Sequence, residues 1–297
     1  MRTIKNDHII FKMKKENKPA LTCRSGDMVT FHTLDCFSNK LIPEESRLGV
    51  DNPRVSNPCT GPLFIKGALP GDTLKIEILD IEVGETGVTI VGPSDGHIEN
   101  GLEDHEVIRV KVDNGYAEVT PTLSLPIEPM IGILGVAPKE GYIPTALPGT
   151  HGGNMDCTQI KKGAIVYLPV FVEGALLSIG DLHALMGDGE VGECGLEIEG
   201  KVVVKVSVLS QVSEVGPVVY VDDKWITIAS ADTLQKASED ATNMMIELLH
   251  RSGHSKMDTA LILNLAANLK VCQIVNRLKT TRMELSEKCF LDKKIFD

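Results

Sequence analysis

Short stretches of alternating apolar and polar residues, separated by glycine and proline, run from Gly26 to about Val208 of this 297-residue chain. The clearest covers residues 73–78, where leucine and isoleucine alternate with lysine and glutamate, the period of a half-buried β-strand. Similar runs occur at residues 29–31, 107–112, 164–172 and 201–208. The pattern predicts a mainly β fold with a sandwich- or barrel-like body. Strands do not alternate with helices, which argues against a parallel doubly wound sheet.

The pattern changes after Gly216, where two strand-like runs predict a hairpin around Asp222 and Asp223. A helix is predicted to begin at Asp232, with Gln235 three residues later as in a capping box. The apolar face expected for this helix consists of Leu234, Ala237, Ala241, Met244 and Leu248, and Gly253 stands where a C-terminal cap belongs.

A second helix is predicted from Ser255 or Asp258 to about Ala267, and residues 269–275 either continue it or form a strand. The chain therefore divides into a β-rich body, residues 1–211, and an α+β C-terminal unit, residues 212–297. We expect this unit to stabilise the body or an oligomer interface, because it holds no dense cluster of glycine, histidine and carboxylate. The main catalytic groups are expected in the body.

Composition excludes several classes of partner. The net charge of −11 argues against nucleic acid, which needs a clustered basic surface. No stretch approaches the roughly 18 consecutive apolar residues of a membrane span, and the lysine-rich N-terminus does not look like a secretory signal. The seven cysteines are odd in number and include no CxxC pair, so a disulfide framework or zinc ribbon is not expected. These features predict a cytoplasmic protein.

Two glycine-rich segments, residues 148–156 (PGTHGGNMD) and 180–190 (GDLHALMGDGE), gather most of the candidate chemistry. Glycine runs of this kind permit close approach of the backbone to a bound group. Carboxylates and imidazoles together are ligands for a cation such as zinc. Asp181 and His183 are two apart, so on a strand they share one face and can converge on one ion. The alternative for this pair is a turn carboxylate beside a hydrogen-bonded core histidine.

Other residues leave alternatives open. Asp35 ends an apparent strand, where a turn role is the simpler interpretation. Residues 57–62 (NPCTGP) form a rigid turn that either scaffolds a loop or lines a pocket. Cys157 and Cys194 lie near the glycine-rich segments and could act as nucleophiles, although buried inert thiols are more common.

Six segments resemble the acetamidase/formamidase family in order along nearly the whole chain. They are NPCTGP, GALPGDTLKIEI (67–78), MIGILGVAP (130–138), PGTHGGNMD, VYLPVFVEGALLSIGDLHALMGDGE (166–190) and QIVNRLKTTRMEL (273–285). The resemblance implies hydrolysis of a short aliphatic amide to ammonia and a carboxylate, a mostly β fold with an α+β C-terminal part, and a homo-oligomer, which we expect to be a dimer. Met186 stands where the family usually has glutamine, and Glu193 where it has a small residue. Loss of that glutamine favours an amide other than acetamide.

We assign roles from this resemblance together with the chemistry. Zn²⁺ is expected to be held by Asp35, Asp181 and His183, with a position open for water. Catalytic roles are predicted for Glu190, as general base and acid, and for His151 and Asp188. Substrate contacts are predicted for Asn154, Asp156, Gly152 and Gly153. The competing hypothesis is a non-catalytic β-rich binding protein with a structural Ca²⁺, and a cysteine-nucleophile amidase is a third.

Overall fold

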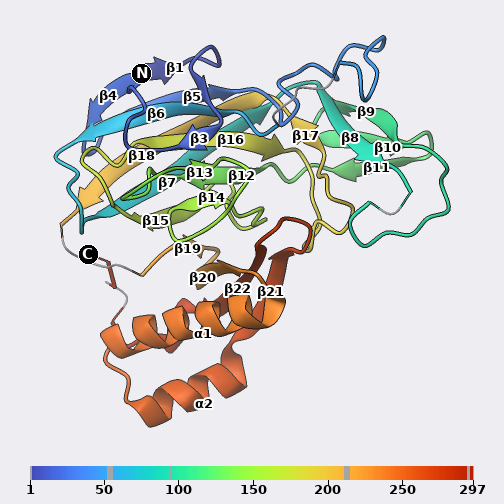
Figure 1. Ribbon diagram of the computed structural model, residues 1–297. Helices are drawn as coiled ribbons and strands as arrows, with labels where there is room; N and C mark the ends of the chain where they lie inside the picture. Colours follow the sequence, from blue (N-terminus) through green and yellow to red (C-terminus); the bar gives the residue numbers. More distant parts are fainter. Residues whose placement is uncertain (1, 52–55, 94, 211–214, 293–294, 297) are drawn as a thin grey trace.

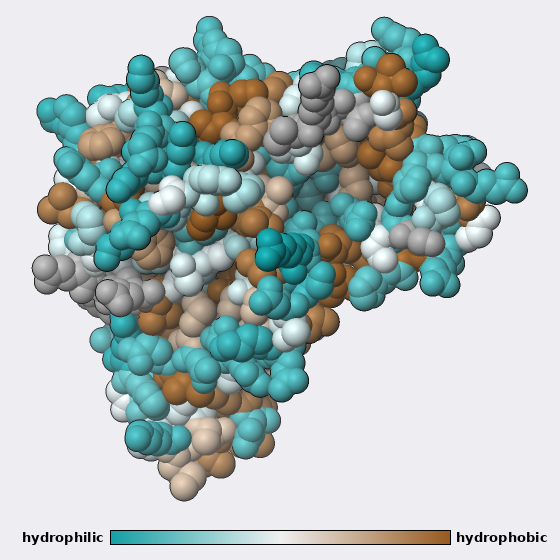
Figure 2. Space-filling view, in the orientation of Figure 1, coloured by the Kyte–Doolittle hydropathy of each residue, from teal (hydrophilic) through white to brown (hydrophobic). Residues whose placement is uncertain are grey.

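The computed structural model describes residues 2–51, 56–93, 95–210, 215–292 and 295–296. Strand accounts for 44% and helix for 11% of the chain, and the two α-helices follow most of the strands, so the predicted fold class is confirmed. Figure 1 shows a layered β body, a lobe of strands at one side, and the two helices at the bottom of the view beside the last strands of the chain. In the view of Figure 2, hydrophilic residues cover much of the surface and apolar ones lie scattered among them.

The first sheet has nine strands and crosses from the body into the C-terminal unit. Its order is β1 (Arg2–Ile4), β5 (Met28–Thr33), β18 (Gly200–Leu209), β7 (Thr73–Val83), β15 (Ile165–Pro169), β19 (Val218–Val221), β20 (Lys224–Ala231), β22 (Lys279–Ser286) and β21 (Asn268–Gln273). All neighbours in it are antiparallel except β1 and β5. The expected strands near residues 29, 73, 164 and 201 are therefore present.

The second sheet carries most of the candidate site. Its main path is β11 (Leu123–Pro126), β10 (Tyr116–Thr120), β9 (Glu106–Asp113), β8 (Thr86–Val91), β17 (Glu197–Ile198), β16 (Leu177–His183), β12 (Met130–Gly135) and β14 (Gly152–Asn154). Beside it, β6 (Cys59–Lys66) pairs with β16, β2 (Ile9–Ile10) and β4 (Leu21–Arg24). A separate pair joins β3 (Lys12–Met13) to β13 (Ile143–Pro144).

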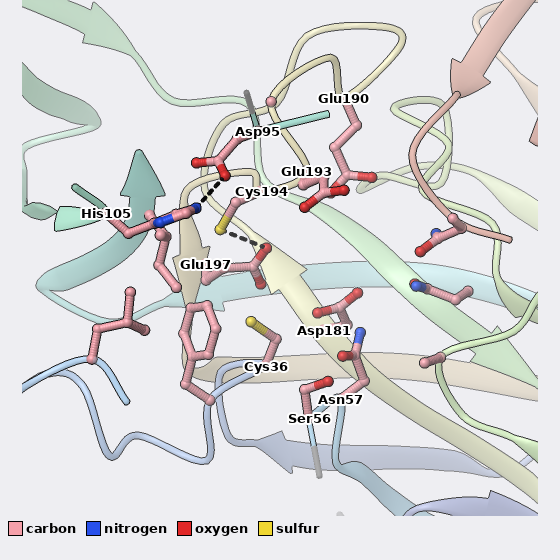
Figure 3. Close-up of a pocket in the computed structure, with 17 residues that line it drawn as sticks. Cys36, Ser56, Asn57, Asp95, His105, Asp181, Glu190, Glu193, Cys194 and Glu197 are labelled. Carbon is pink, nitrogen blue, oxygen red and sulfur yellow. Dashed lines mark hydrogen bonds and ion pairs between the residues drawn. The ribbon is translucent and has the colours of Figure 1, made fainter. Parts of the chain in front are cut away.

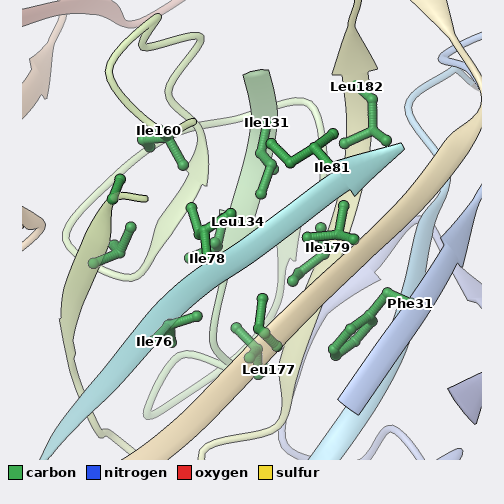
Figure 4. Close-up of a cluster of buried hydrophobic side chains, with 14 of the residues drawn as sticks. Phe31, Ile76, Ile78, Ile81, Ile131, Leu134, Ile160, Leu177, Ile179 and Leu182 are labelled. Carbon is green, nitrogen blue, oxygen red and sulfur yellow. The ribbon is translucent and has the colours of Figure 1, made fainter. Parts of the chain in front are cut away.

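The main core lies between the two sheets. In β7 the alternation predicted from sequence buries Leu74, Ile76 and Ile78, while the intervening charged residues remain partly exposed. Figure 4 shows these isoleucines facing Leu177 and Ile179 of β16 across the layer. Burial of this apolar surface is the dominant favourable contribution to folding, and it fixes β16 against the first sheet.

The C-terminal helices are α1 (Leu234–Arg251) and α2 (Lys256–Ala266), followed by a short 3₁₀ helix, η1 (Glu287–Cys289), after β22. Thr233, not Asp232, caps α1, because its side-chain oxygen accepts a hydrogen bond from the Lys236 amide. The predicted start was therefore one residue early. Ser255 caps α2, which decides between the two starts that the sequence allowed.

The apolar face of α1 is shifted slightly from the prediction. The buried residues are Ala237, Ala241, Met245, Leu248 and Leu249. Leu234 is exposed and Met244 only partly buried, because the helix packs on β20 and β22 through a narrower stripe.

The predicted hairpin is present as β19 and β20, and the ambiguous residues after α2 form β21, the last strand of the first sheet. The predicted domain boundary at residue 211 lies outside the described residues. The strands on either side of it belong to one sheet, so the two units share their hydrogen-bonded framework. None of the helices in the described parts of the chain is long and apolar enough to cross a membrane.

Candidate active site

A cavity of about 390 Å³ opens where β16 and β17 meet the loops after β5 and β8 (Figure 3). Its described walls consist of Cys36, Phe37, Leu48, Ser56, Asn57, Ile90, Asp95, His105, Ala146, Asn154, Asp181, Glu190, Gly192, Glu193, Cys194, Glu197 and Asn276. These residues come from both glycine-rich segments and from five further stretches of the chain. Asn57 belongs to the rigid turn at residues 57–62, so that turn does contribute to a pocket.

Strand β16 brings Asp181 and His183 to one end of the cavity. Leu182 points into the core between the sheets, so its two neighbours lie on the opposite face, as their spacing predicts. His183 Nε2 lies 3.8 Å from Asp181 Oδ2. Both side chains are almost completely buried, and Asp181 has a left-handed backbone with φ of +56°.

Glu197 of β17 faces His183 across the sheet, because the two residues are opposite each other in the strand register. Glu197 Oε1 lies 3.0 Å from His183 Nε2. Burial opposes a charge on His183, but Glu197 and Asp181 more than compensate and raise its pKa well above the usual value. Burial also raises the pKa of Glu197 to about 8. The imidazole thus lies between two buried carboxyl groups.

A second pair of carboxyl groups lies beside this one. Glu190 and Asp156 share a hydrogen bond, and the ligand atoms of Asp156, His183 and Glu190 lie within 4.8 Å of one another. Burial raises the pKa of Glu190 to about 7, despite the opposing effect of His183. Burial and the charge of Glu190 raise the pKa of Asp156 well above its usual range. Glu190 is therefore poised to gain or lose a proton near neutral pH.

Two asparagine side chains hold these carboxylates in place. With its amide oriented to satisfy its neighbours, Asn154 donates to Asp156 Oδ1 and to Asp181 Oδ2, both at 3.0 Å. Asn276 Nδ2 donates to Asp156 Oδ2 at 2.9 Å and lies 3.2 Å from the Asn154 oxygen. Asn276 belongs to the loop between β21 and β22, so the C-terminal unit reaches into the cavity.

Gly132 on β12 leaves the space that the carboxylates occupy. A Cβ atom at this position would lie 2.7 Å from Asp156 Oδ1 and 2.7 Å from Asp181 Oδ2. Gly152 and Gly153 have positive φ angles, and a Cβ on either would lie closer than 2.5 Å to a backbone oxygen. These two glycines let β14 pack tightly on β12 and carry Asn154 to the cavity, but their own atoms do not line it.

Asp35 and His151 are buried next to the site and are not among the described residues that line the cavity. Asp35 Oδ1 accepts a hydrogen bond from the Asn39 amide, and burial raises the pKa of Asp35 to about 6. Its neighbour Cys36 does line the cavity, with its sulfur within 4.8 Å of ligand atoms of Asp181 and Glu197. Neither ring nitrogen of His151 meets a hydrogen-bonding partner in the described structure, and burial lowers its pKa to about 4.

Asp188 is engaged elsewhere. Arg282 of β22 donates to both of its carboxylate oxygens, at 2.8 Å and 2.7 Å, and Thr158 Oγ1 donates at 2.8 Å. Burial opposes ionisation of Asp188, but Arg282 outweighs it and lowers the pKa. Arg282 also donates to Glu284 at 2.7 Å. The ion pair therefore ties the loop that leads to Glu190 to the C-terminal sheet.

The thiols and Met186 have different surroundings. Cys157 lies in the main core, while Cys194 lines the cavity with its sulfur 3.8 Å from Glu197 Oε1. Burial raises the pKa of Cys194 well above the usual value, which keeps the thiol protonated and weakens it as a nucleophile. Met186 Sδ lies 3.2 Å from His183 Nδ1, so the residue that departs from the family pattern contacts the imidazole directly.

The acetamidase/formamidase family model matches residues 5–146 and 140–290. The chain belongs to this family. An acetamidase structure from Bacillus halodurans is 44% identical, with a TM-score of 0.91, and covers 96% of this chain and 97% of that one. A predicted acetamidase/formamidase from Thermoanaerobacter tengcongensis is 45% identical, with a TM-score of 0.93, and covers 97% and 96%.

A relative from Schizosaccharomyces pombe with formamidase in its name is 28% identical over 254 residues, or 62% of this chain. The match spans only 60% of the length of that relative. The family assignment therefore rests on the family model together with the near-complete matches to solved structures.

Among the lining residues that the sequence analysis did not single out, three lie beside the carboxyl cluster: Cys36, Glu197 and Asn276. Glu197 lies in an alternating Leu-Glu-Ile-Glu run, where glutamate reads as the solvated face of a strand. Asn276 lies within one of the segments that resemble the acetamidase/formamidase family, and this was its only signal. Both reach the site through long-range pairing, which local patterns do not report.

Proposed function

We propose that this chain hydrolyses a short aliphatic amide to ammonia and the corresponding carboxylate, with the assistance of a bound metal ion. One observation supports this most strongly. Four buried carboxyl groups, those of Asp156, Asp181, Glu190 and Glu197, surround a single imidazole at the end of one cavity. Buried carboxylates repel one another, so such a cluster is stable only with protons or a cation among them.

The donor set fits a zinc ion. Asp181 Oδ1 and Glu197 Oε2 are buried and make no hydrogen bond in the described structure, and the described partners of His183 Nε2 are the carboxyl groups of Asp181 and Glu197 themselves. Imidazole with carboxylates suits zinc, whereas calcium takes oxygen ligands alone. We keep Asp181 and His183 as the proposed ligands. Glu197 is a more direct third donor than Asp35, because its Oε1 lies 3.0 Å from His183 Nε2, whereas Asp35 Oδ1 is engaged by the Asn39 amide.

Such an ion, when bound, polarises the amide carbonyl and lowers the pKa of water toward about 7. Glu190 takes the proton from the attacking water and delivers it to the departing nitrogen, a task that matches its pKa of about 7. Asp156 orients Glu190 through their shared hydrogen bond. Asn154 and Asn276 in turn orient Asp156.

The remaining residues predicted from the sequence position or pack against the reacting groups. Asp188 anchors the segment that carries Glu190, through Arg282. Gly152 and Gly153 position Asn154. His151 is neutral at pH 7 because burial lowers its pKa, and it fills the space between Gly149 and Gly153.

The test is ammonia release from formamide, acetamide and propionamide by purified protein. Protein as isolated, chelator-treated protein, and treated protein supplied with Zn²⁺ or Ca²⁺ are compared, together with their metal content. Asp181→Ala and His183→Ala should each lose bound zinc while remaining folded. His8→Ala, which changes an exposed histidine, is the matched control.

The outcomes separate the alternatives. Turnover that survives complete metal removal contradicts metal assistance but leaves amide hydrolysis standing. Calcium binding without turnover of any amide supports the calcium-binding protein instead. Inactivation by a thiol reagent, in protein that keeps its metal, would revive the cysteine nucleophile. The proposed homodimer is measured separately, by light scattering of the same preparation.

A further inference from the structure

The cavity is larger than acetamide requires. We propose that it admits amides with an acyl chain longer than acetyl, and that it discriminates against acyl chains that carry a negative charge. The inference rests on the proposed function and names the substrate class of the same site. Acetamide has four non-hydrogen atoms and fills on the order of 100 Å³, if each atom takes about the volume of a water molecule. The cavity of about 390 Å³ leaves room for several more carbon atoms.

Apolar side chains are available to contact such a chain. Phe37, Leu48, Ile90 and Ala146 all line the cavity, and each is only partly buried. They come from the loops after β5 and β13 and from the end of β8, whereas the reacting groups lie on β16, on β17 and in the segment between them. An acyl chain that extends from the reacting carbonyl toward them would remove apolar surface from water. Moving one methylene group from water to an apolar surface contributes about 0.8 kcal/mol, which corresponds to roughly a fourfold increase in kcat/KM.

Acidic residues outnumber basic ones among the described residues that line the cavity. Carboxylates line the cavity at Asp95, Asp181, Glu190, Glu193 and Glu197, and His105 is the one basic residue among the described lining residues. His105 Nε2 is already paired with Asp95 Oδ1 at 2.7 Å. Figure 3 shows this pair on the side of the cavity away from Asp181. A substrate carboxylate would find no free cationic partner among these residues.

Glu193 is the lining residue that we expect to discriminate most strongly against an anionic substrate. A bound cation can neutralise the inner carboxylates, but Glu193 is exposed at the rim and forms no ion pair with any described residue. The charge of Glu193 contributes to the raised pKa of Glu190, so the two carboxyl groups lie within electrostatic range of each other. At about 8 Å and an effective dielectric near 40, one such carboxylate disfavours an anionic substrate by about 1 kcal/mol, or roughly sixfold. An ammonium group in the same position would be favoured.

The experiment measures kcat/KM for two matched series on the metal-loaded wild-type protein. The length series is formamide, acetamide, butyramide and pentanamide. The charge series is pentanamide, 4-aminobutanamide and succinamate, which are similar in length but neutral, cationic and anionic. We expect kcat/KM to rise from acetamide to pentanamide, and kcat/KM for succinamate to fall roughly sixfold below that for pentanamide. 4-Aminobutanamide should equal or exceed pentanamide.

Variants locate the effect. Phe37→Ala should lower the ratio of pentanamide to acetamide, and Glu193→Gln should narrow the gap between pentanamide and succinamate. Glu140→Gln, an exposed glutamate that does not line the cavity, should change neither ratio. High salt should narrow the succinamate gap in the wild type, because exposed charges are screened.

Acetamide hydrolysis with no turnover of butyramide or pentanamide would overturn the inference and leave the proposed function intact. So would succinamate turnover equal to that of pentanamide. If no amide is cleaved at all, the proposed function fails. Calorimetric binding of the same charge series then tests the inference by itself, and equal affinities or no binding would overturn it.

Discussion

Replacing Asn276 with alanine should slow turnover while leaving the metal and the fold in place. Asn276 Nδ2 donates to Asp156 Oδ2 at 2.9 Å, and Asp156 shares a hydrogen bond with Glu190, the proposed proton carrier. The Asn276 side chain is therefore two hydrogen bonds from the proposed proton transfer. It contacts neither His183 nor Glu197 through any hydrogen bond in the described residues.

Gln273 holds Asn276 in this position. Its Oε1 accepts from the amides of Val275 and Asn276, at 3.0 Å and 2.9 Å. Its Nε2 donates to the Leu278 carbonyl at 2.6 Å and to Thr280 Oγ1 at 2.9 Å. Gln273 is fully buried, and both the oxygen and the nitrogen of its side-chain amide are hydrogen-bonded, so it fixes the conformation of the loop that carries Asn276.

The size of the effect follows from these contacts. A hydrogen bond to a charged group contributes about 1.5–3 kcal/mol, so its loss should lower kcat/KM by roughly 10- to 150-fold. Asn276→Asp should cost at least as much, because it replaces the donor with a second carboxylate facing Asp156. Gln273→Ala should cost a similar factor by releasing the loop. Because both changes act on one contact, the double variant should lose little more than either single one.

The assay is steady-state ammonia release with kcat and KM separated, alongside zinc content and thermal melting for each variant. Arg277→Ala changes an exposed neighbour on the same loop and serves as the control. The reasoning fails if Asn276→Ala stays within twofold of wild type while Glu190→Gln loses activity. It also fails if the two single losses add fully in the double variant, since they would then act independently.

Three further changes test other parts of the site. Glu190→Gln should keep zinc and fold but lose about 10²–10⁴ in kcat, and wild-type kcat/KM should rise with pH through about 7, because the base must be deprotonated. Gly132→Ala should lower zinc content measured by metal analysis, because its Cβ would lie 2.7 Å from oxygens of two site carboxylates. Asp188→Asn should lower the free energy of unfolding by about 2 kcal/mol, because the buried Arg282 loses its bidentate partner. The loss is smaller than for a fully buried ion pair, because the Asp188 side chain is 40% exposed. Arg282 depresses the pKa of Asp188, so this stabilisation is full above about pH 4 and is lost as the pH falls further.

The fold was predictable where local periodicity coincided with burial. Strand β7 alternates from Leu74 to Ile78, and one face of this stretch forms part of the core, so a single segment revealed both its conformation and its buried side. The start of α1 was placed one residue early because Asp232 and Thr233 are both good capping residues. Only the backbone geometry distinguishes them, and it gives Thr233 the hydrogen bond.

The site was predictable in part for a related reason. Asp181, Glu190 and Asn154 stand in glycine-rich segments, and glycine at such density indicated close approach of backbone to side chains or ligand. Glu197 and Asn276 have no such local marker. They reach the cavity through the pairing of β17 with β16 and through the loop that joins β21 to β22. Contacts between residues so far apart in the chain depend on strand register, which no short motif encodes.

Three of the site carboxylates stand at backbone positions that are strained for any residue other than glycine. Asp156, Asp181 and Glu190 have φ angles of +44°, +56° and +45°, a region that L-residues other than glycine rarely adopt. Each such residue costs of order 1–3 kcal/mol, and the cost is tolerated only where surrounding contacts determine the conformation. Here the packing of β16 between two strands and the asparagine hydrogen bonds supply those contacts. Glycine would relieve the backbone at all three positions but would remove the carboxylate. Retaining an acidic side chain there trades stability for chemistry, which is the expected signature of groups aimed at a bound cation and a transferred proton.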